Sequence, residues 1–466
     1  MARSISLVSL AAIAWPFLSI AQTSPDVARI LERLDRIEEE NRALANEVRA
    51  LRAELAASRQ ANALDGEHAA SAASRQPNAP DGEPPAPEPA QPSVSVEDRL
   101  GIQQARIEEM AQTKVEASQK FPMRLAGMAL FNAFMNSRQS GGVDYPVVAA
   151  PTGPGHDGAT VRQSIVGLEF TGPTAVWGGH VHGSVYMDFF AGATNSAMRI
   201  RTASIGIDWK TRSLAAGLEK PIFNPREPSS LAQVGISPLT GAGNLWLWLP
   251  QVRVEQELRL AQNTGIRAQI GAVQTREIGP YVGAIAPEAV RPAAEGRFNF
   301  HHNFDDERRL EFATGFHSST THAAGHSIPS NLYSFDWFFN PWKAVEFTGV
   351  FYSGQNVAHL GSGTRQGYAI YARYAYAVQS KGGWGQLTIH ALPRLDFHLF
   401  TGQVDDNNRD LTAGAIGKNL LYGANAYFRI APNVLVGLEA TQLRTMYIGQ
   451  GVRINNHYDL ALAYLF

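Results

Sequence analysis

The last eleven residues constrain the fold most strongly, because large apolar side chains recur there at every second position. The residues between them are polar or small. This period of two places a row of apolar residues on one face of a β-strand and a row of polar or small residues on the other. A soluble sandwich produces the same alternation, but it seldom ends its chain on an aromatic residue in the last strand position. The apolar row consists of Tyr458, Leu460, Leu462, Tyr464 and Phe466.

Phe466 adds a second constraint, because an aromatic residue at the last position resembles the terminal signature of bacterial outer-membrane β-barrels. The resemblance implies that the barrel-assembly machinery reads Phe466 as an assembly signal. It also implies that outer-membrane lipid surrounds the strands. Taken alone, this strand leaves a soluble sandwich and a barrel as equal alternatives.

The opposite end of the chain has the features of a signal peptide. Arg3 supplies a short basic region, residues 5–17 are almost wholly apolar, and Ser19-Ile20-Ala21 is a small-x-small cleavage site. We therefore expect residues 1–21 to direct the mature protein out of the cytoplasm. After them, no apolar run approaches the ~18 residues that a spanning helix needs. A secreted or periplasmic protein without lipid contact is the alternative.

The composition changes near position 121. Nearly all Phe, Tyr and Trp residues lie in residues 121–466, Gly occurs throughout them, and the whole chain has no Cys. The lack of Cys excludes a disulfide framework, Cys metal sites and a thiol nucleophile. A β-domain of this length exceeds the usual sandwich and suits a many-stranded barrel. We therefore predict an all-β transmembrane barrel over residues 121–466.

Residues 22–56 carry a heptad pattern, which predicts a coiled coil. Asn41 is the one polar residue of the seam, and we expect it to fix the register at a cost in stability; a tolerated exposed break is the alternative. The charges at the g and e positions match for a parallel partner, so this helix is built to pair with copies of itself. Asn41 favours a dimer, whereas the barrel favours a trimer. The a positions are Val27, Leu34, Asn41, Val48 and Leu55, and the d positions are Ile30, Ile37, Leu44 and Leu51.

Two further segments join this helix to the barrel. Residues 57–94 are rich in Pro, Ala, Gly and Glu, with hardly a large apolar residue. They cannot bury a core, so we predict an extended linker. Residues 95–120 are predicted to form a short helix that leads the chain to the barrel, with Ser95 and Asp98 as a weak capping box.

The barrel segment is predicted to contain sixteen antiparallel strands, connected alternately by long loops and short turns. Bacterial barrels place short turns in the periplasm and long loops outside. One more alternating segment, residues 368–376, would send Phe466 to the outside if it were a strand, so we assign it to an external loop, as a short hairpin. The predicted strands are 122–136, 161–172, 178–191, 198–209, 212–220, 250–260, 264–275, 295–304, 308–318, 329–339, 343–353, 382–391, 394–403, 418–430, 433–446 and 453–466; the long loops are 137–160, 221–249, 276–294, 319–328, 354–381 and 404–417.

Charged residues that alternate with apolar ones predict which face of the wall points inward. Val252, Val254, Leu258 and Leu260, for example, alternate with four charged residues. An Arg facing lipid at the bilayer midplane costs roughly 2–4 kcal/mol, so we expect these charges to line a water-filled lumen. The predicted pore-lining residues are Asp188, Arg199, Arg201, Lys220, Arg226, Arg253, Glu255, Glu257 and Arg259.

The connection 221–249 is far longer than a surface connection requires, and several prolines stiffen it. Lys220 and Arg226 give it positive charge. We predict that it folds into the lumen as the constriction; an external cap or a latch between subunits is the alternative. Trp246 and Trp248 share one face, and we predict that they lie in the external aromatic girdle rather than stack on a sugar.

The order of these features resembles that of the DcaP-like trimeric porins. The resemblance implies a homotrimer, a periplasmic coiled-coil stalk and passive uptake of small anions such as dicarboxylates. The features that carry it are the signal peptide, the heptad helix, the Pro/Ala spacer, the Arg-bearing strand 198–203, the long loop before Pro250 and the terminal Phe466.

Metal and enzyme chemistry are less well supported. His301 and His302 would point to opposite faces of a strand, and residues 405–410 lack the spacing of an EF-hand, so we expect no metal. We therefore predict a passive, mildly anion-preferring outer-membrane porin that is not an enzyme and has no cofactor and no nucleic-acid partner. A structural tether between the outer membrane and the periplasmic layer, acting through the coiled coil, is the alternative.

Overall fold

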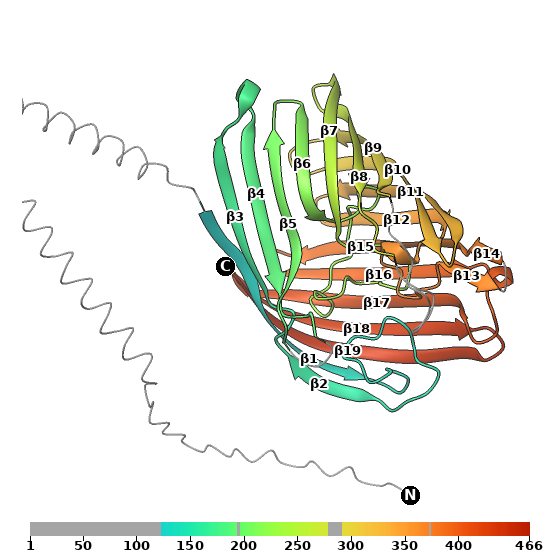
Figure 1. Ribbon diagram of the computed structural model, residues 1–466. Helices are drawn as coiled ribbons and strands as arrows, with labels where there is room; N and C mark the ends of the chain where they lie inside the picture. Colours follow the sequence, from blue (N-terminus) through green and yellow to red (C-terminus); the bar gives the residue numbers. More distant parts are fainter. Residues whose placement is uncertain (1–122, 193–195, 278–290, 372–373) are drawn as a thin grey trace, which may run out of the picture. The chain divides into compact units, whose positions relative to one another are not determined.

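The computed structural model describes residues 123–192, 196–277, 291–371 and 374–466 (Figure 1). The predicted signal peptide, the coiled coil with Asn41, the linker and the short helix lie outside the described residues. Within the described part, no helix is long and apolar enough to span a membrane. The strands are β1 (Met123–Asn136), β2 (His156–Thr160), β3 (Ile165–Thr174), β4 (His180–Asp188), β5 (Arg199–Asp208), β6 (Arg212–Glu219), β7 (Leu249–Ala261), β8 (Thr264–Val273), β9 (Ala293–Asn303), β10 (Arg309–Ala323), β11 (His326–Trp342), β12 (Val345–Gln355), β13 (Tyr368–Tyr371), β14 (Tyr374–Ala377), β15 (Gln379–Leu392), β16 (Leu395–Asp406), β17 (Ile416–Ala431), β18 (Val434–Tyr447) and β19 (Gly451–Leu465).

Seventeen of these strands form one antiparallel sheet that closes on itself. The closure joins β1 to β19, in a register that runs from Met128 opposite Leu465 to Asn136 opposite His457. Beyond that register, the backbones of Gly127 and Phe466 exchange two hydrogen bonds of 2.9 and 3.1 Å. The final residue is therefore part of the seam that converts an open sheet into a barrel.

β2 and β3 occupy a single position in the wall. β2 pairs with Asn132–Asn136 of β1, and β3 pairs with Met123–Met128 of the same strand. Seventeen strands therefore make sixteen wall positions, which confirms the predicted barrel. The prediction placed residues 156–160 in a loop, and this was wrong. The sequence His-Asp-Gly-Ala-Thr has no apolar alternation to mark it, so only pairing with β1 makes it a strand.

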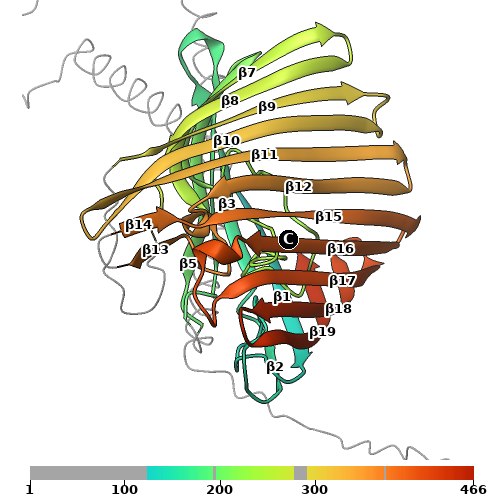
Figure 2. The ribbon, with the colours of Figure 1, turned by 90° about the vertical axis from the view of Figure 1, so that its right-hand side faces the viewer.

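One end of the barrel carries short turns and both ends of the described chain, and the other carries the long loops. The prediction of a long loop over 319–328 was wrong, because β10 and β11 continue to a two-residue turn at Ala324-Gly325, where both residues have positive φ. The segment 368–376 is outside the wall, as predicted: β13 and β14 form a separate two-stranded sheet. Figure 2 shows this hairpin at the end of the long strands β11 and β12.

The two faces of the wall differ in the predicted way. On β19, Tyr458, Leu460, Leu462 and Tyr464 are 45 to 51% exposed, whereas the alternate residues, such as Ala463, are buried. On β7 the four apolar residues named above are likewise about half exposed. An apolar outer row and a polar or small inner row are the pattern of a transmembrane barrel.

The buried core lies inside the barrel, between the wall and the connection from β6 to β7. Phe223 and Leu245 of this connection pack against Leu332, Tyr352 and Leu360, all nearly inaccessible to solvent. The apolar contacts that fix the molecule therefore also fix the connection within the lumen. We call residues 220–248 the inner loop.

Candidate channel constriction

The inner loop follows the inside of the wall around much of the barrel. In order along the loop, Phe223 is bonded to β11, Ser229 to β15 and β17, Leu231 to β1, and Gly235 to β5. The structure thus confirms the prediction that this connection folds into the lumen, and it is not an external cap. A loop bonded to so many strands narrows the lumen at a fixed level.

An ion-pair cluster holds the loop on the β9–β11 side. Arg226 donates to Asp336 at 2.6 Å and to Glu311 at 2.8 Å. Arg297 of β9 donates to both oxygens of the same Asp336 at 2.8 Å. The Asp336 side chain is fully buried, so two guanidinium groups compensate one desolvated carboxylate. Arg226 was predicted from the sequence, whereas Arg297 and Asp336 were not.

A second cluster lies on β4 and β5. Arg199 and Arg201 share one face, as predicted, and both donate to the fully buried Asp188 at 2.8 Å. Both also donate to carbonyl oxygens of the inner loop. Trp248 packs over them, with its ring centre 5.4 and 4.6 Å from the two guanidinium carbons. These arginines therefore hold the loop as well as carrying charge.

Trp246 and Trp248 were predicted to lie in an external girdle, and this was wrong. Both are more than nine-tenths buried, and their rings meet edge to face at 4.9 Å. Their segment belongs to the returning arm of the inner loop, so the spacing of two reflects an extended loop segment rather than an outer wall. The sequence did not distinguish these cases, since each gives an aromatic residue at every second position.

Glu227 connects the two arms of the inner loop. It accepts hydrogen bonds from Lys220 and from Ser237. Burial opposes the charged form of Glu227, but the neighbouring Lys220 and these hydrogen bonds outweigh it and hold its pKa below the usual range. At neutral pH, Lys220 is therefore neutralised by a carboxylate of the same loop.

The four predicted charges on β7 lie at different depths. Arg253 is paired with Glu219, close to the start of the inner loop. Glu255 and Glu257 both bind Arg267 of β8, at 3.1 and 3.3 Å. Arg259 is exposed near the short-turn end of the strand. It is therefore at the mouth of the lumen rather than at the constriction.

Neutral amides also hold the loop, and they were not predicted from the sequence. Gln163 contacts three loop residues, donating to the carbonyl of Ala232 and accepting from two backbone amides, at 2.7 to 2.8 Å. Asn132 and Asn425 each donate to a loop carbonyl, at 2.9 and 2.8 Å. Isolated amides carry no distinctive signal in a sequence. Alternation with apolar residues could have placed Asn132 and Asn425 on the inner face, whereas Gln163 lies in the turn between β2 and β3.

A buried network lies beneath the start of the loop. His317 bridges Glu295 at 2.8 Å and Ser319 at 2.9 Å, an order that resembles a hydrolase triad. Glu295 also accepts the backbone N–H of Ile222, and the His317 ring packs against Phe223. The network therefore anchors the inner loop, and both Glu295 and His317 are fully enclosed.

A polar cavity of about 440 Å³ lies between the inner loop and the wall. Three arginines and three glutamates line it, together with neutral polar groups. Among the arginines, Arg267 is the most open, with 46% of its side chain exposed, against 12% for Arg226 and 6% for Arg297. The charged lining residues are Arg226, Arg267, Arg297, Glu227, Glu311 and Glu346.

The same architecture occurs in solved channel structures. The outer-membrane channel DcaP of Acinetobacter baumannii superposes with a TM-score of 0.62 at 17% identity, over 74% of this chain and 97% of that one. An anion-selective porin from Comamonas acidovorans gives a TM-score of 0.53 at 9% identity, over 74% and 100%. No family model and no curated protein matches the sequence. At these identities the likeness shows the fold, and it agrees with the resemblance found in the sequence.

Proposed function

We propose that this protein is an outer-membrane porin for passive diffusion of small, hydrophilic solutes. The observation that carries the proposal is the inner loop: it lies within a closed barrel and leaves a cavity lined by charged side chains. A polar lumen of this kind suits a water-filled path rather than a packed core. Two solved channels with the same fold support the assignment.

A mild preference for anions follows from the chemistry of the cavity. Its positive groups are all guanidinium groups, which offer five N–H donors each and bind carboxylates in a bidentate way. Arg267 keeps nearly half of its side chain open while contacting two carboxylates. Because most lumen arginines are ion-paired, the preference is expected to be weak. Dicarboxylate-like solutes are the class we propose.

Assembly and location form a second part of the proposal. The barrel would lie in the outer membrane, with the short-turn end in the periplasm and Phe466 read by the assembly machinery. The protein would form a homotrimer, with the heptad helix of residues 22–56 as a periplasmic stalk. The heptad pattern is also the observation that favours the second candidate, a tether to the periplasmic layer.

Solute entry into proteoliposomes tests the proposal. Vesicles that contain the purified protein should swell in isotonic succinate and, more slowly, in a sugar of similar size, because both solutes are hydrophilic and small. Vesicles that contain heat-denatured protein serve as the control. If the vesicles swell in neither succinate nor the sugar, the porin is rejected.

Deletion of residues 27–92 separates the two candidates. A porin should keep its solute flux without this segment. A tether should lose its effect on envelope integrity when the segment is deleted, whether or not the barrel conducts solutes. A deletion protein that folds, shown by circular dichroism, yet loses all flux would contradict the assignment of the path to the barrel.

A further inference from the structure

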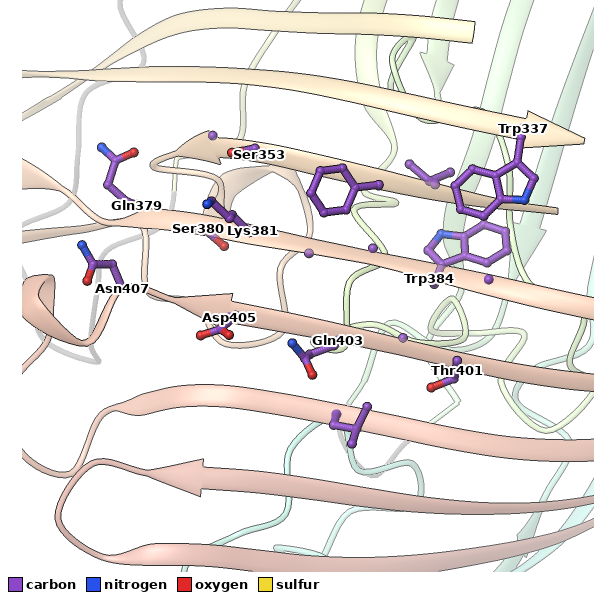
Figure 3. A pocket seen from close by; sticks show the side chains of 18 residues that line it. Trp337, Ser353, Gln379, Ser380, Lys381, Trp384, Thr401, Gln403, Asp405 and Asn407 are labelled. Atoms are coloured by element: carbon purple, nitrogen blue, oxygen red, sulfur yellow. The ribbon is translucent and has the colours of Figure 1, made fainter. Parts of the chain in front are cut away.

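A hollow lies on the outer face of the wall, across β12, β15 and β16, and it is distinct from the lumen (Figure 3). Its cavity volume is about 1000 Å³. On β15, Lys381 and Gly385 point into it, whereas the alternate residues Ser380 and Trp384 are buried toward the interior. We call this hollow the outer trough.

Glycine forms the floor of the outer trough. A Cβ added at Gly385 would meet nothing closer than 3.8 Å, so the space above this residue is open. The indole of Trp337 lies over Gly349 and marks one end, and Phe351, opposite Gly383, lies between this end and Lys381. Figure 3 shows Trp337 at this end. This end of the trough is therefore apolar and flat, and it has room for an acyl chain.

The inner loop supports the floor from within. Gly243 of the loop has a φ of +99°, and its Cα approaches the backbone of Gly383 so closely that an added Cβ would clash with it. In the same way, the carbonyl of Ala242 lies against Gly402. Backbone packed on backbone is stiff, so the trough is a preformed feature of the wall.

The other end of the outer trough is polar. Lys381 is exposed, and within the described residues no ion pair is formed by it, whereas the nearby Asp405 is paired with Lys418 at 2.9 Å. Asp405 lies directly opposite Lys381 in the register of β15 and β16, and Asp410 accepts the backbone N–H of Gln379 at 3.0 Å. Within the described residues, Lys381 is therefore a cation of the trough lining whose ammonium group has no ion-pair partner. Neutral hydrogen-bonding groups surround Lys381, and Figure 3 shows several of them at the end away from Trp337. They are Ser353, Gln379, Gln403 and Asn407.

We propose that the outer trough binds a phosphorylated glycolipid, with one acyl chain on the glycine floor and the phosphate at Lys381. The proposal rests on the barrel spanning a membrane. Lipid tails are as apolar as the outer wall, so an acyl chain that leaves the bilayer for the trough gains only packing contacts. The headgroup must therefore supply the specificity. The amides and the hydroxyl around Lys381 are more donors and acceptors than one phosphate needs, and they suit sugar hydroxyls.

The direction of the trough agrees with this occupant. β15 runs from Gln379 at the long-loop end to Leu392 at the short-turn end, so Lys381 lies toward the long loops and Gly385 toward the middle of the wall. A lipid of the leaflet at the long-loop end has the same order, with its headgroup outermost. A lipid of the opposite leaflet would place its phosphate against Trp342 and Leu392 instead.

Native mass spectrometry of the full-length protein in a neutral detergent tests the proposal, with monophosphoryl lipid A as the probe. Phosphatidylglycerol, which also carries one phosphate charge, is the second arm. Lipid A should bind at least fivefold more tightly. Lys381→Gln should weaken its binding by about fivefold, the effect expected for one basic residue at an anionic headgroup. Lys381→Arg should bind as the wild type does.

Gly385→Leu places its Cβ in open space above the floor and should also weaken lipid A binding by at least fivefold, because the rest of the side chain occupies the trough. Lys210→Gln removes an exposed charge in the turn between β5 and β6, at the opposite end, and should change nothing. Circular dichroism confirms that each variant is folded. Solute flux should be unchanged in all of them. If the wild type itself shows no flux, the porin is rejected, and the lipid-binding result can still be interpreted.

Three outcomes would overturn the proposal. Wild-type binding by both Lys381→Gln and Gly385→Leu would show that the outer trough is not the site. Equal affinity for phosphatidylglycerol would show that no sugar is recognised. A change of oligomeric mass in Gly385→Leu, without bound lipid in the wild type, would show that the trough is a contact between copies of the chain.

Discussion

Two sets of side chains hold the same loop by different chemistry, and we call them the two sides of the loop. From β4, β5 and β9–β11, arginines and buried carboxylates bind it, with Asp188 and Asp336 as the centres. From β1, β15, β17 and the turn before β3, neutral amides bind it, with Gln163 as the main one. The two sets meet at Gly235, where Gln163 accepts from the N–H and Arg199 donates to the carbonyl, and Glu439 of β18 adds one carboxylate by accepting from Ser230. Ion pairs can both hold the loop and create a field in the lumen, whereas amides only hold it. Changes on the two sides should therefore have separable effects on loop stability and on ion preference.

The largest effect is expected for Asp336→Ala. It would leave Arg226 and Arg297 without their shared partner, and removing one member of a buried ion pair costs roughly 3–5 kcal/mol. Hydrogen exchange of residues 224–230 should accelerate by more than a hundredfold, since each 1.4 kcal/mol is tenfold. The preference for anions should rise at the same time, because two cations lose their counter-ion.

Asp336→Asn serves as the isosteric control for that change. It keeps the shape of the side chain and some hydrogen bonds but removes the charge, so the exchange should accelerate less while anion preference rises equally. Unchanged preference in both variants would contradict the role given to this cluster in the field.

Gln163→Leu should loosen the loop without altering ion preference. It removes three hydrogen bonds, to the carbonyl of Ala232 and from two backbone amides of the loop, and each is worth about 0.5–1.5 kcal/mol net because water of the lumen can take its place. Exchange of residues 231–236 reports the loss. A shifted ion preference in Gln163→Leu would mean that the two sides are not separable.

A smaller, pH-dependent effect is expected where the long loop after β12 is buried on the wall. Burial, and then the positive charge that His317 can carry, hold the pKa of His359 well below its usual value of about 6.5. Below pH 6.5 the unfolded segment takes up a proton that the folded one does not. The loop should therefore lose stability as the pH falls, by at most about 1.4 kcal/mol per pH unit. The protection factors of residues 356–366, which are exchange rates relative to the intrinsic rate at each pH, measure this at pH 7 and pH 5, and His359→Asn should remove their pH dependence.

The smallest effect is expected for Arg259→Gln. This residue is exposed near the short-turn end of β7, where water screens its charge. Ion preference should change by less than in Arg267→Gln, whose side chain lines the cavity. A larger change in Arg259→Gln would place the selective region at the mouth instead of at the loop.

Strand alternation made most of the barrel predictable. The outer rows of β7 and β19 could be predicted because contact with lipid requires apolar residues at every second position. The position of Phe466 indicated which end of the barrel carries the long loops. The sequence did not predict the strand at residues 156–160 or the extension of β10 and β11. Polar strand segments outside the apolar belt lack this alternation. Pairing with neighbouring strands determines them, and a single sequence does not show pairing.

The site was predictable in its charges but not in its partners. Asp188, Arg199 and Arg201 were assigned to one inner face by alternation, and the structure brings them together. Asp336 was missed because it lies among neutral and aromatic residues on its own strand. Arg297 was missed although Glu295 shares its face of β9, because its role depends on Asp336 and on Arg226 of a distant loop. The error at Trp248 has the same origin, since its burial depends on how the loop returns through the lumen.

The reversal potential across a planar bilayer in a tenfold gradient of KCl tests the central claim most directly. If the lumen beside the inner loop is the path and its arginines set the field, the wild type should show a weak preference for chloride. Arg267→Gln should reduce that preference without loss of conductance. A preference for potassium, or conductance in which Arg267→Gln leaves the reversal potential unchanged, would contradict the account.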